Sequence, residues 1–337
     1  LVVLFATCSL NRGFLAPYGT STDCTPALAK LAEQSMVFER HMTEAGASGV
    51  AYASLFTGLQ ADRHGVYLHP SQLGEDVLTI FEAFAAAGWE THYFHGHRMA
   101  APELGYAQGV APEHLVPLTG EKKKRRALSR EDASFTRLLE RLQADSELRA
   151  LVVVNFTVTH GAYTAQIEQE ELDAFLAAHP EKAQGFTPDD LRRLGKLYED
   201  NRLALQWDFE RTAERLALSR DDQELLARVL AAVYAADVGL LDGIVGGALD
   251  NLRASRLDQD TLFAFTSDHG EYHFQRERLF QWSHDLQLTP DDLCVPWLLR
   301  PARGAFAPGR YPAVTRSIDV FPTLAGLCGV PLPAGAV

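Results

Sequence analysis

Short apolar runs rich in β-branched residues recur along the chain and alternate with segments whose apolar residues follow helical spacing. The strongest runs are residues 1–7, 151–158 and 261–267, and the longest helical pattern spans residues 225–252. Such runs predict buried strands, and apolar residues at helical spacing predict amphipathic helices. The alternation therefore predicts an α/β fold, with helices on both faces of a mostly parallel, doubly wound sheet.

Weaker patterns complete this picture. We expect strands at 36–41, 91–94 and 295–299, and helices from residue 26 and at 53–58, 77–87, 134–142 and 319–327. The stretch of about 165–220 is polar and helical in pattern, and we expect it to form an insertion that caps the core. We treat residues 1–337 as a single domain.

Polar side chains follow the predicted strands at their carboxyl ends. Cys8 follows the first strand, His160 follows the strand at 151–158, and Asp268 and His269 follow the strand at 261–267. In a doubly wound sheet these ends share one edge, and ligands bind in the crevice there. We therefore expect these residues to meet. His160 has two interpretations, a site residue or a half-buried, hydrogen-bonded histidine.

The chemistry of these residue types favours a metal site beside a nucleophile. Asp268 and His269 offer an oxygen and an imidazole nitrogen to a divalent metal, and Gly270 would let the backbone turn tightly there. Ser48 lies in a glycine-flanked loop that runs into a predicted helix, where backbone N–H groups favour an anion. Ser48 is therefore a candidate nucleophile, and a helix N-cap is the alternative.

Two further polar groups are interpreted as surface features. His95 and His97 follow the strand at 91–94 and predict a surface turn. The basic run at 122–126 predicts a solvated loop.

The acidic composition argues against some classes of binding partner. With 44 Asp and Glu against 31 Lys and Arg, the formal net charge is −13, which argues against nonspecific nucleic-acid binding and against adhesion to anionic membranes. The spacing of the four cysteines fits no zinc ribbon and does not require disulfides. No signal peptide or membrane span is predicted within this chain, so any membrane attachment would lie in a flanking segment.

Several motifs in this order resemble the sulfatase branch of the alkaline-phosphatase superfamily over nearly the whole chain. The matching segments are Pro17-Tyr-Gly19, Thr25-Pro-Ala-Leu-Ala-Lys-Leu-Ala-Glu, Ser54-Leu-Phe-Thr-Gly-Leu59, Arg63-His-Gly-Val66, Thr266-Ser-Asp-His-Gly-Glu271 and Ser317-Ile-Asp-Val-Phe-Pro-Thr-Leu324. The resemblance implies an alkaline-phosphatase-like fold. It also implies a small C-terminal subdomain, which would be truncated or lost after Val337.

The resemblance also assigns roles by position. It makes Asp268 and His269 metal ligands, with Cys8 in place of the family's first metal-binding Asp, and it puts Ser48 at the nucleophile position. His160 and His284 would contact oxygens of the substrate's sulfate or phosphate. One divalent ion is implied, with zinc, manganese, magnesium and calcium all open. By family analogy alone the location would be periplasmic or secreted.

The chain departs from the family pattern around the nucleophile. Val50 and Tyr52 occupy the places of the Pro and Arg that direct conversion to formylglycine, so we do not expect formylglycine here. Cys8 is a softer ligand than Asp and suits zinc. Gly13 replaces an acidic residue. These losses remove much of the charge stabilisation that such sites use.

Two functions therefore remain open. In the first, the chain is a metal-dependent hydrolase or transferase of phosphate or sulfate esters, with Ser48 as an unmodified nucleophile. Its substrate would be a small-molecule, glycan or lipid ester. In the second, the fold is a catalytically degenerate module for binding or scaffolding. Bound metal and turnover that depends on Ser48 separate the two.

Overall fold

The computed structural model describes residues 1–19, 24–163 and 167–333. These residues contain one eight-stranded sheet with the order β4-β3-β5-β1-β6-β7-β2-β8. The strands are β1 (Val2–Thr7), β2 (Met36–Met42), β3 (Glu90–His95), β4 (Leu115–Pro117), β5 (Ala150–Phe156), β6 (Leu262–Ser267), β7 (Trp297–Arg300) and β8 (Gly309–Arg316).

The centre of the sheet is parallel, as the sequence predicts. β1 lies between β5 and β6, and its last residue Thr7 is paired with both Phe156 and Ser267. The carboxyl ends of these three strands therefore align at one edge. Among the described strands, β7 runs antiparallel to its neighbours β6 and β2. All three central strands are buried along their whole length, which explains their continuous apolar runs.

Twelve α-helices surround the described sheet. They are α1 (Pro26–Glu33), α2 (Ser48–Thr57), α3 (Ala61–His64), α4 (Ile80–Ala86), α5 (Glu121–Arg125), α6 (Ala133–Ala144), α7 (Gln169–Ala178), α8 (Pro188–Trp207), α9 (Phe209–Arg215), α10 (Arg220–Ala254), α11 (Pro290–Leu293) and α12 (Val320–Leu327). The predicted helices at 77–87 and 225–252 are present as α4 and α10, with boundaries shifted by a few residues.

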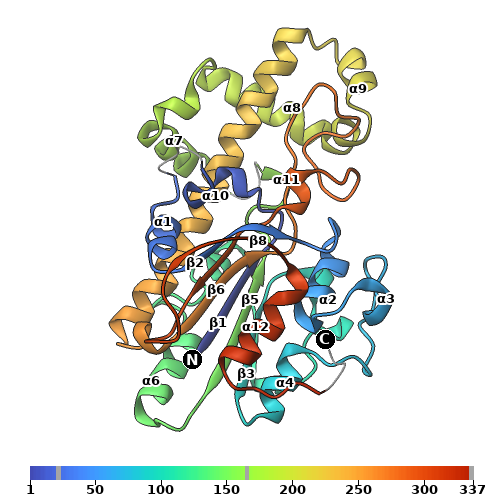
Figure 1. Ribbon diagram of the computed structural model, residues 1–337. Coiled ribbons are helices and arrows are strands. Elements are labelled where there is room, and N and C mark those ends of the chain that lie inside the picture. The colour runs from blue at the N-terminus through green and yellow to red at the C-terminus, as the bar shows by residue number, and fades with distance from the viewer. Residues whose placement is uncertain (20–23, 164–166, 334–337) are drawn as a thin grey trace.

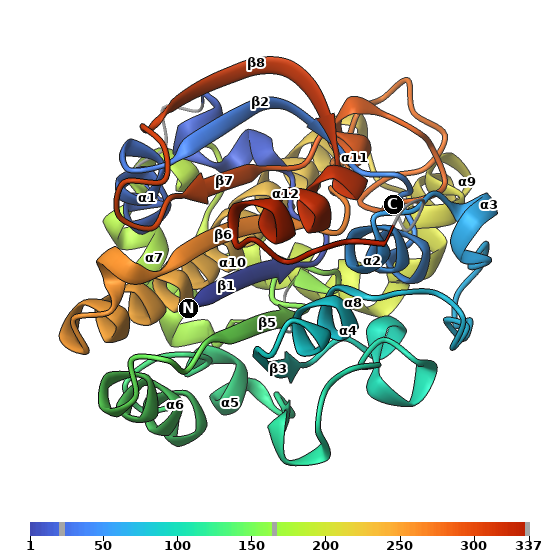
Figure 2. The same ribbon diagram turned by 60° about the horizontal axis from the view of Figure 1, so that its bottom comes forward.

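Two apolar cores lie on opposite faces of the sheet. On one face Val3 and Phe5 pack with α10 and α6, and on the other Val2 and Leu4 pack with α2, α4 and α12. This division follows from the two-residue period of β1, whose side chains point alternately to either face. Figure 2 shows α12 and α2 on the opposite side of the sheet from α10.

Helix α10 is the longest element in the described chain. By length and composition alone it could cross a membrane, and 72% of its most apolar window is buried inside the molecule. Its Leu230, Val233 and Leu241 belong to the core beneath the sheet. This burial is the pattern of a core helix in a globular protein.

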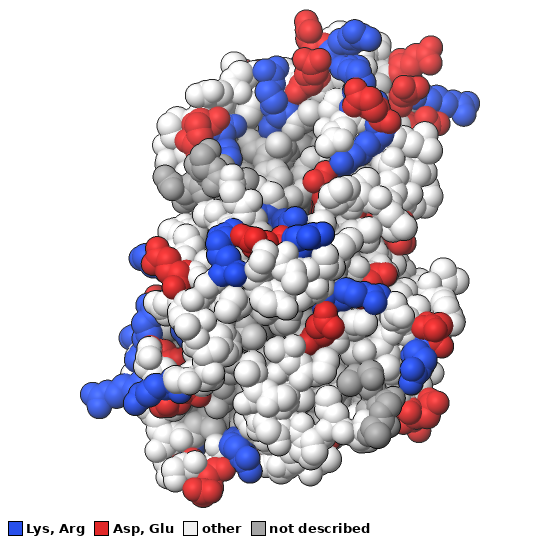
Figure 3. Space-filling model, viewed as in Figure 1, with Lys and Arg blue, Asp and Glu red and all other residues white. Residues whose placement is uncertain are grey.

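Helices α7, α8 and α9 occupy the region for which an insertion is expected. Figure 1 shows them beyond the edge toward which β1 points, beside one end of α10. Their outer surface carries both signs of charge close together (Figure 3). In α8, for example, Lys196 Nζ lies 3.0 Å from Asp200 Oδ1. Such alternation favours a solvated helical face over a patch of single sign.

The interpretation of 122–126 as a loop is wrong in part. Residues 121–125 form the short helix α5, because Lys and Arg are good helix formers and Gly120 supplies the turn before it. Arg125 pairs with Glu171 of α7, so the basic run helps to join the insertion to the core.

Candidate active site

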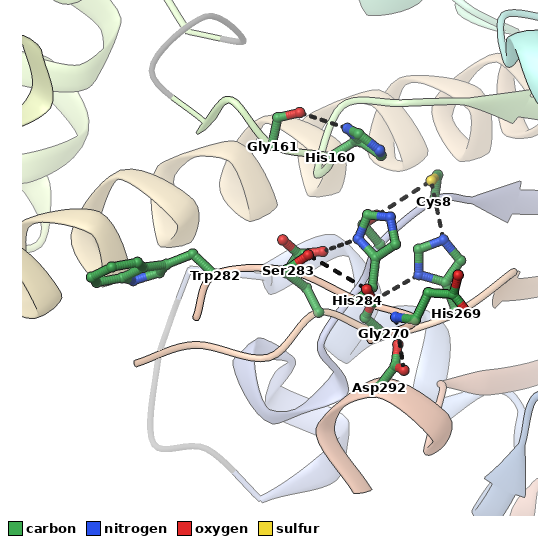
Figure 4. A network of polar contacts seen from close by, with 12 residues as sticks. Cys8, His160, Gly161, His269, Gly270, Trp282, Ser283, His284 and Asp292 are labelled. Atoms are coloured by element: carbon green, nitrogen blue, oxygen red, sulfur yellow. Dashed lines mark hydrogen bonds and ion pairs between the residues drawn. The ribbon is translucent and has the colours of Figure 1, made fainter. Parts of the chain in front are cut away.

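Cys8 lies where the carboxyl ends of β1 and β6 and the start of α2 converge. Its Sγ is 3.6 Å from Ser48 Oγ, 3.8 Å from His269 Nε2 and 3.2 Å from His97 Nε2. All four residues are buried. Cys8, Asp268 and His269 thus lie together at one edge of the sheet, as their positions at strand ends predict, and Ser48 lies beside them. Figure 4 shows Cys8 and His269 side by side, with His284 and His160 nearby.

Asp268 is held with one oxygen satisfied and the other unused. Its Oδ1 accepts the N–H of Ser9 at 3.2 Å and of His269 at 2.6 Å. Ser9 has a φ of 56°, a left-handed conformation that few residues other than glycine adopt. Oδ2 is buried and has no hydrogen-bond partner among the described residues. Burial raises the pKa of Asp268 to about 7. A buried carboxylate oxygen without a donor fits a metal ligand.

The tautomer of His269 follows from its backbone contact. Its Nδ1 lies 2.8 Å from the carbonyl oxygen of Gly270, which can only accept, so Nδ1 carries the proton. Burial lowers the pKa of His269 well below the ordinary value, so the ring is neutral and Nε2 holds a lone pair. Ser48 Oγ donates to Nε2 at 2.9 Å. That lone pair can therefore take the hydroxyl proton of Ser48 or ligate a metal.

Ser48 is the first residue of α2, and Ala47 is the N-cap. Its interpretation as a loop residue, and the alternative as an N-cap, are therefore both corrected. N–H groups in the first turn have no intrahelical acceptor and favour negative charge. Ser48 Oγ thus lies at a place suited to an anionic ester.

The donor set fits a divalent ion. Asp268 Oδ2 is 3.4 Å from His269 Nε2, and the ligand atoms of Cys8, His97 and Asp268 all lie within 4.8 Å of one another. Thiolate, imidazole and carboxylate together suit zinc better than calcium or magnesium. Burial and the nearby Asp268 carboxylate raise the pKa of the Cys8 thiol, so ion binding must displace its proton.

The prediction of a surface turn at His95 and His97 is wrong, because His95 is the half-buried last residue of β3 and His97 is buried. His97 is 5% exposed, and its Nδ1 accepts the N–H of Met99 at 3.1 Å. Burial lowers its pKa to about 3. The neutral ring therefore carries its proton on Nε2 and directs it at Cys8 Sγ. In this tautomer His97 orients the sulfur rather than ligating a metal. Its place after a parallel strand neighbouring β5 is the signal that could have identified it.

His160 and His284 lie beside the metal motif. The ring centroid of His284 is 4.3 Å from that of His269 and 5.1 Å from that of His160. His284 Nδ1 donates to Glu271 Oε2 at 2.8 Å. Burial opposes the charged form of His284, but the Glu271 carboxylate outweighs it and the pKa is raised. Glu271 was not predicted as a site residue, although it closes the same motif.

Two cations near the site were also missed. Lys124 of α5 places Nζ 3.5 Å from Thr157 Oγ1, directly after β5, and its charge acts on His97. Arg202 of α8 places Nη1 3.5 Å from the carbonyl oxygen of Gly161, next to His160. Lys124 belongs to the basic run at 122–126 that we interpreted as a solvated loop, whereas Arg202 comes from the expected insertion, far along the chain from the strand ends.

Gly270 is required by a close approach rather than by a turn. Its N–H donates to the carbonyl of Asp292 at 2.6 Å. A Cβ at this position would come within 1.9 Å of the carbonyl oxygen of Asp291. The absence of a side chain therefore lets the backbone of α11 press against the site.

A family model and a curated relative both relate this chain to sulfatases. The model of the Sulfatase family matches residues 1–330. A choline-sulfatase of Rhizobium meliloti (strain 1021) is 25% identical over 91% of this chain, and the chain spans 63% of that relative's length.

Solved structures share the fold at low sequence identity. A protein in complex with its substrate D-glucosamine-2-N,6-O-disulfate has a TM-score of 0.68 and 16% identity, covering 99% of this chain and 78% of that chain. The phosphonate monoester hydrolase of Agrobacterium radiobacter has a TM-score of 0.63 and 18% identity, covering 98% and 74%. At this identity the likeness shows the fold.

Proposed function

This chain belongs to the sulfatase family, within the alkaline-phosphatase superfamily, and we propose that it hydrolyses or transfers sulfate or phosphate esters with unmodified Ser48 as nucleophile. The observation that carries the proposal is the 2.9 Å contact from Ser48 Oγ to the Nε2 lone pair of His269, beside Cys8 and Asp268. Members of this family generally bind a divalent metal, and Cys8, Asp268 and His269 would hold it here.

The chemistry starts at Ser48 Oγ. With His269 holding the ion, the Ser48 hydroxyl would release its proton to water. Its oxygen attacks the sulfur or phosphorus, and the bond to the leaving alkoxide breaks as a proton from water converts it to the alcohol. Water or another hydroxyl then releases the group from Ser48. A bound divalent ion would polarise the ester oxygen and favour the alkoxide of Ser48. N–H groups at the start of α2 face the developing charge.

The surrounding side chains recognise the anionic group. His284, whose charged form is supported by Glu271, and His160 would contact its outer oxygens. Lys124 and Arg202 add positive charge on two sides. The chemistry fits an ester of a small molecule, glycan or lipid. The choline-sulfatase relative and the sulfated-sugar complex favour sulfate, and the phosphonate hydrolase favours phosphorus.

We infer an unmodified serine from Val50 and Tyr52 of α2, which replace the Pro and Arg of the formylglycine motif. Tyr52 is fully buried, and its hydroxyl donates to the carbonyls of Ala6 and Thr7 at 3.2 Å. Val50 is 6% exposed and belongs to the core above the sheet. Both positions therefore pack the fold, and we propose that Ser48 keeps its hydroxyl.

A catalytically degenerate binding module is the second candidate. Burial favours it, because Ser48 is 2% exposed and Asp268 is 1% exposed. An ester would have to displace side chains to reach Ser48. The two candidates make opposite predictions about turnover.

The deciding experiment compares Ser48→Ala with Ser54→Ala. Both serines lie in α2, but Ser54 bonds His64 away from the site. The zinc-loaded protein is assayed with aryl sulfate and aryl phosphate, and its metal content is measured. We expect about one ion per site and a loss of at least 100-fold in kcat for Ser48→Ala alone. Absent turnover in the metal-loaded wild type would instead favour the binding module.

A further inference from the structure

A second group of metal-ligating side chains lies at the other end of β3. Glu90 and His92 belong to β3, and His114 ends the short 3-10 helix η5 (Pro112–His114). Each offers one ligand atom, and these three atoms lie within 4.8 Å of one another. β3 runs from this group toward His97, so the group is separate from the site around Cys8.

The register of the sheet builds this arrangement. Glu90 and His92 are two residues apart in a strand and therefore share one face. The parallel pairing of Tyr93 with Leu115 places His92 beside His114. Their rings stack with centroids 4.0 Å apart and planes 23° apart. Glu90 Oε2 lies 3.3 Å from His92 Nε2. Two imidazoles and one carboxylate thus converge on one face.

We propose that Glu90, His92 and His114 bind a divalent ion of the zinc class. Two histidines and one glutamate form a ligand set that holds zinc and leaves a fourth position for water. Imidazole nitrogen selects late transition metals over magnesium and calcium. On binding, the ion takes the place of the proton on His92 Nε2 beside Glu90, and the ring stays neutral because its one proton moves to Nδ1.

Burial prepares the site for a metal. His92 is 7% exposed, whereas Glu90 and His114 are half-buried, so an ion has access from solvent. Burial, helped by the nearby His114, lowers the pKa of His92 to about 4. A neutral imidazole is the form that ligates.

Arg141 of α6 faces the group and is the main competitor. Its Nη1 and Nη2 lie 2.9 Å and 2.5 Å from the two oxygens of Glu90. The Arg141 side chain is 48% exposed, so water screens the pair, although its bidentate geometry makes it stronger than a typical surface ion pair and an ion must compete with it. A ligating carboxylate commonly keeps such a hydrogen bond in its outer sphere. Arg141 therefore tunes the affinity of the site without blocking it.

An ion here would join the edge of the sheet to its interior. His114 directly precedes β4, the three-residue strand at the end of the sheet. His92 belongs to the longer β3 beside it. Such a link fastens a short strand that has few hydrogen bonds of its own.

The test counts zinc equivalents on the full chain. Zinc chloride is titrated against a chromophoric chelator with wild type, His114→Ala and the control Glu113→Ala, an adjacent exposed carboxylate. We expect His114→Ala to lose one equivalent or to bind it at least about tenfold more weakly. Glu113→Ala should keep it, and Arg141→Ala should bind it more tightly. Equal stoichiometry and affinity in wild type and His114→Ala would overturn the proposal.

Cobalt separates this site from the one at Cys8. Thiolate bound to Co²⁺ gives a charge-transfer band that a site of nitrogen and oxygen ligands lacks. We expect His114→Ala to lose weak visible bands only, with ester turnover unchanged. Glu90→Gln provides a second variant if His114→Ala fails to fold. Visible bands as intense in both folded variants as in the wild type, at the same cobalt loading, would contradict the assignment, whatever the outcome at Ser48.

Discussion

Helix α2 carries two serine–histidine pairs whose hydrogen bonds run in opposite directions. Ser48 Oγ lies 2.9 Å from His269 Nε2, and Ser54 Oγ lies 3.0 Å from His64 Nε2. By distance and burial the pairs are nearly alike. They differ in what each Nδ1 contacts, which is the carbonyl of Gly270 for His269 and the N–H of Val66 for His64.

That contact decides the chemistry of each serine. A carbonyl holds the proton on Nδ1 of His269, so Nε2 accepts and Ser48 can be deprotonated. A backbone N–H leaves the proton on Nε2 of His64, so His64 donates and Ser54 remains an ordinary hydroxyl. One pair is suited to nucleophilic chemistry or metal ligation, whereas the other ties α3 to α2.

The largest contrast is expected for activity. His269→Ala removes the lone pair facing Ser48 together with a proposed metal ligand, and we expect kcat for ester hydrolysis to fall by about 10³-fold or more. His64→Ala should leave kcat within about threefold, because His64 contacts no reacting group. Steady-state kinetics on metal-loaded proteins measures both. A comparable loss in His64→Ala would remove the functional distinction between the pairs.

The second contrast concerns how the free energy of unfolding depends on pH through the titration of His64. Burial lowers its pKa to about 4, whereas the unfolded chain protonates near the ordinary 6.5. The unfolded state therefore gains a proton first, and the free energy of unfolding falls as pH drops from 6.5 to 4. The shift corresponds to about 3 kcal/mol.

Urea unfolding between pH 7 and pH 4 measures this slope, with His64→Gln as the comparison because it cannot titrate. We expect His64→Gln to lose stability less steeply with acid than the wild type. Equal slopes would show that His64 is protonated in the folded protein as readily as in the unfolded chain.

The third contrast is the cost of removing each hydroxyl. Ser54→Ala leaves the Nε2–H of His64 buried without an acceptor, which costs about 1–3 kcal/mol. Ser48→Ala leaves only a lone pair facing a polar site, and we expect a smaller loss or none. Urea unfolding of the metal-free proteins compares them. A larger loss in Ser48→Ala would mean that the assigned hydrogen-bond directions are reversed.

The two pairs also show which features could be predicted from the sequence and which could not. The apolar runs at β1, β5 and β6 predict the parallel centre of the sheet because burial on both faces leaves a continuous apolar pattern. Position at strand ends predicts that Cys8, Asp268 and His269 come together. The tautomers could not be predicted, because they depend on single backbone contacts such as that of Gly270. His97 carried the same strand-end signal but was assigned to the surface, because its burial depends on contacts with Cys8 and the α2 region. The positions of Lys124 and Arg202 arise from packing between distant segments.

The smallest expected effect concerns the positive charge of Lys124, which lies near the site of Ser48 and His269. Lys124 lies beside Thr157 and acts electrostatically on His97, whereas Ser54 of the second pair bonds His64 of α3. Lys124→Ala should raise KM for an anionic ester about threefold to tenfold and leave stability nearly unchanged, because a screened charge contributes about 1 kcal/mol. Lys122→Ala, exposed on the same helix, is the matched control and should change neither. The increase in KM should shrink at high salt, since screening already weakens the charge in the wild type. If both variants behave alike at low salt, the positive charge at the site is diffuse rather than supplied by Lys124.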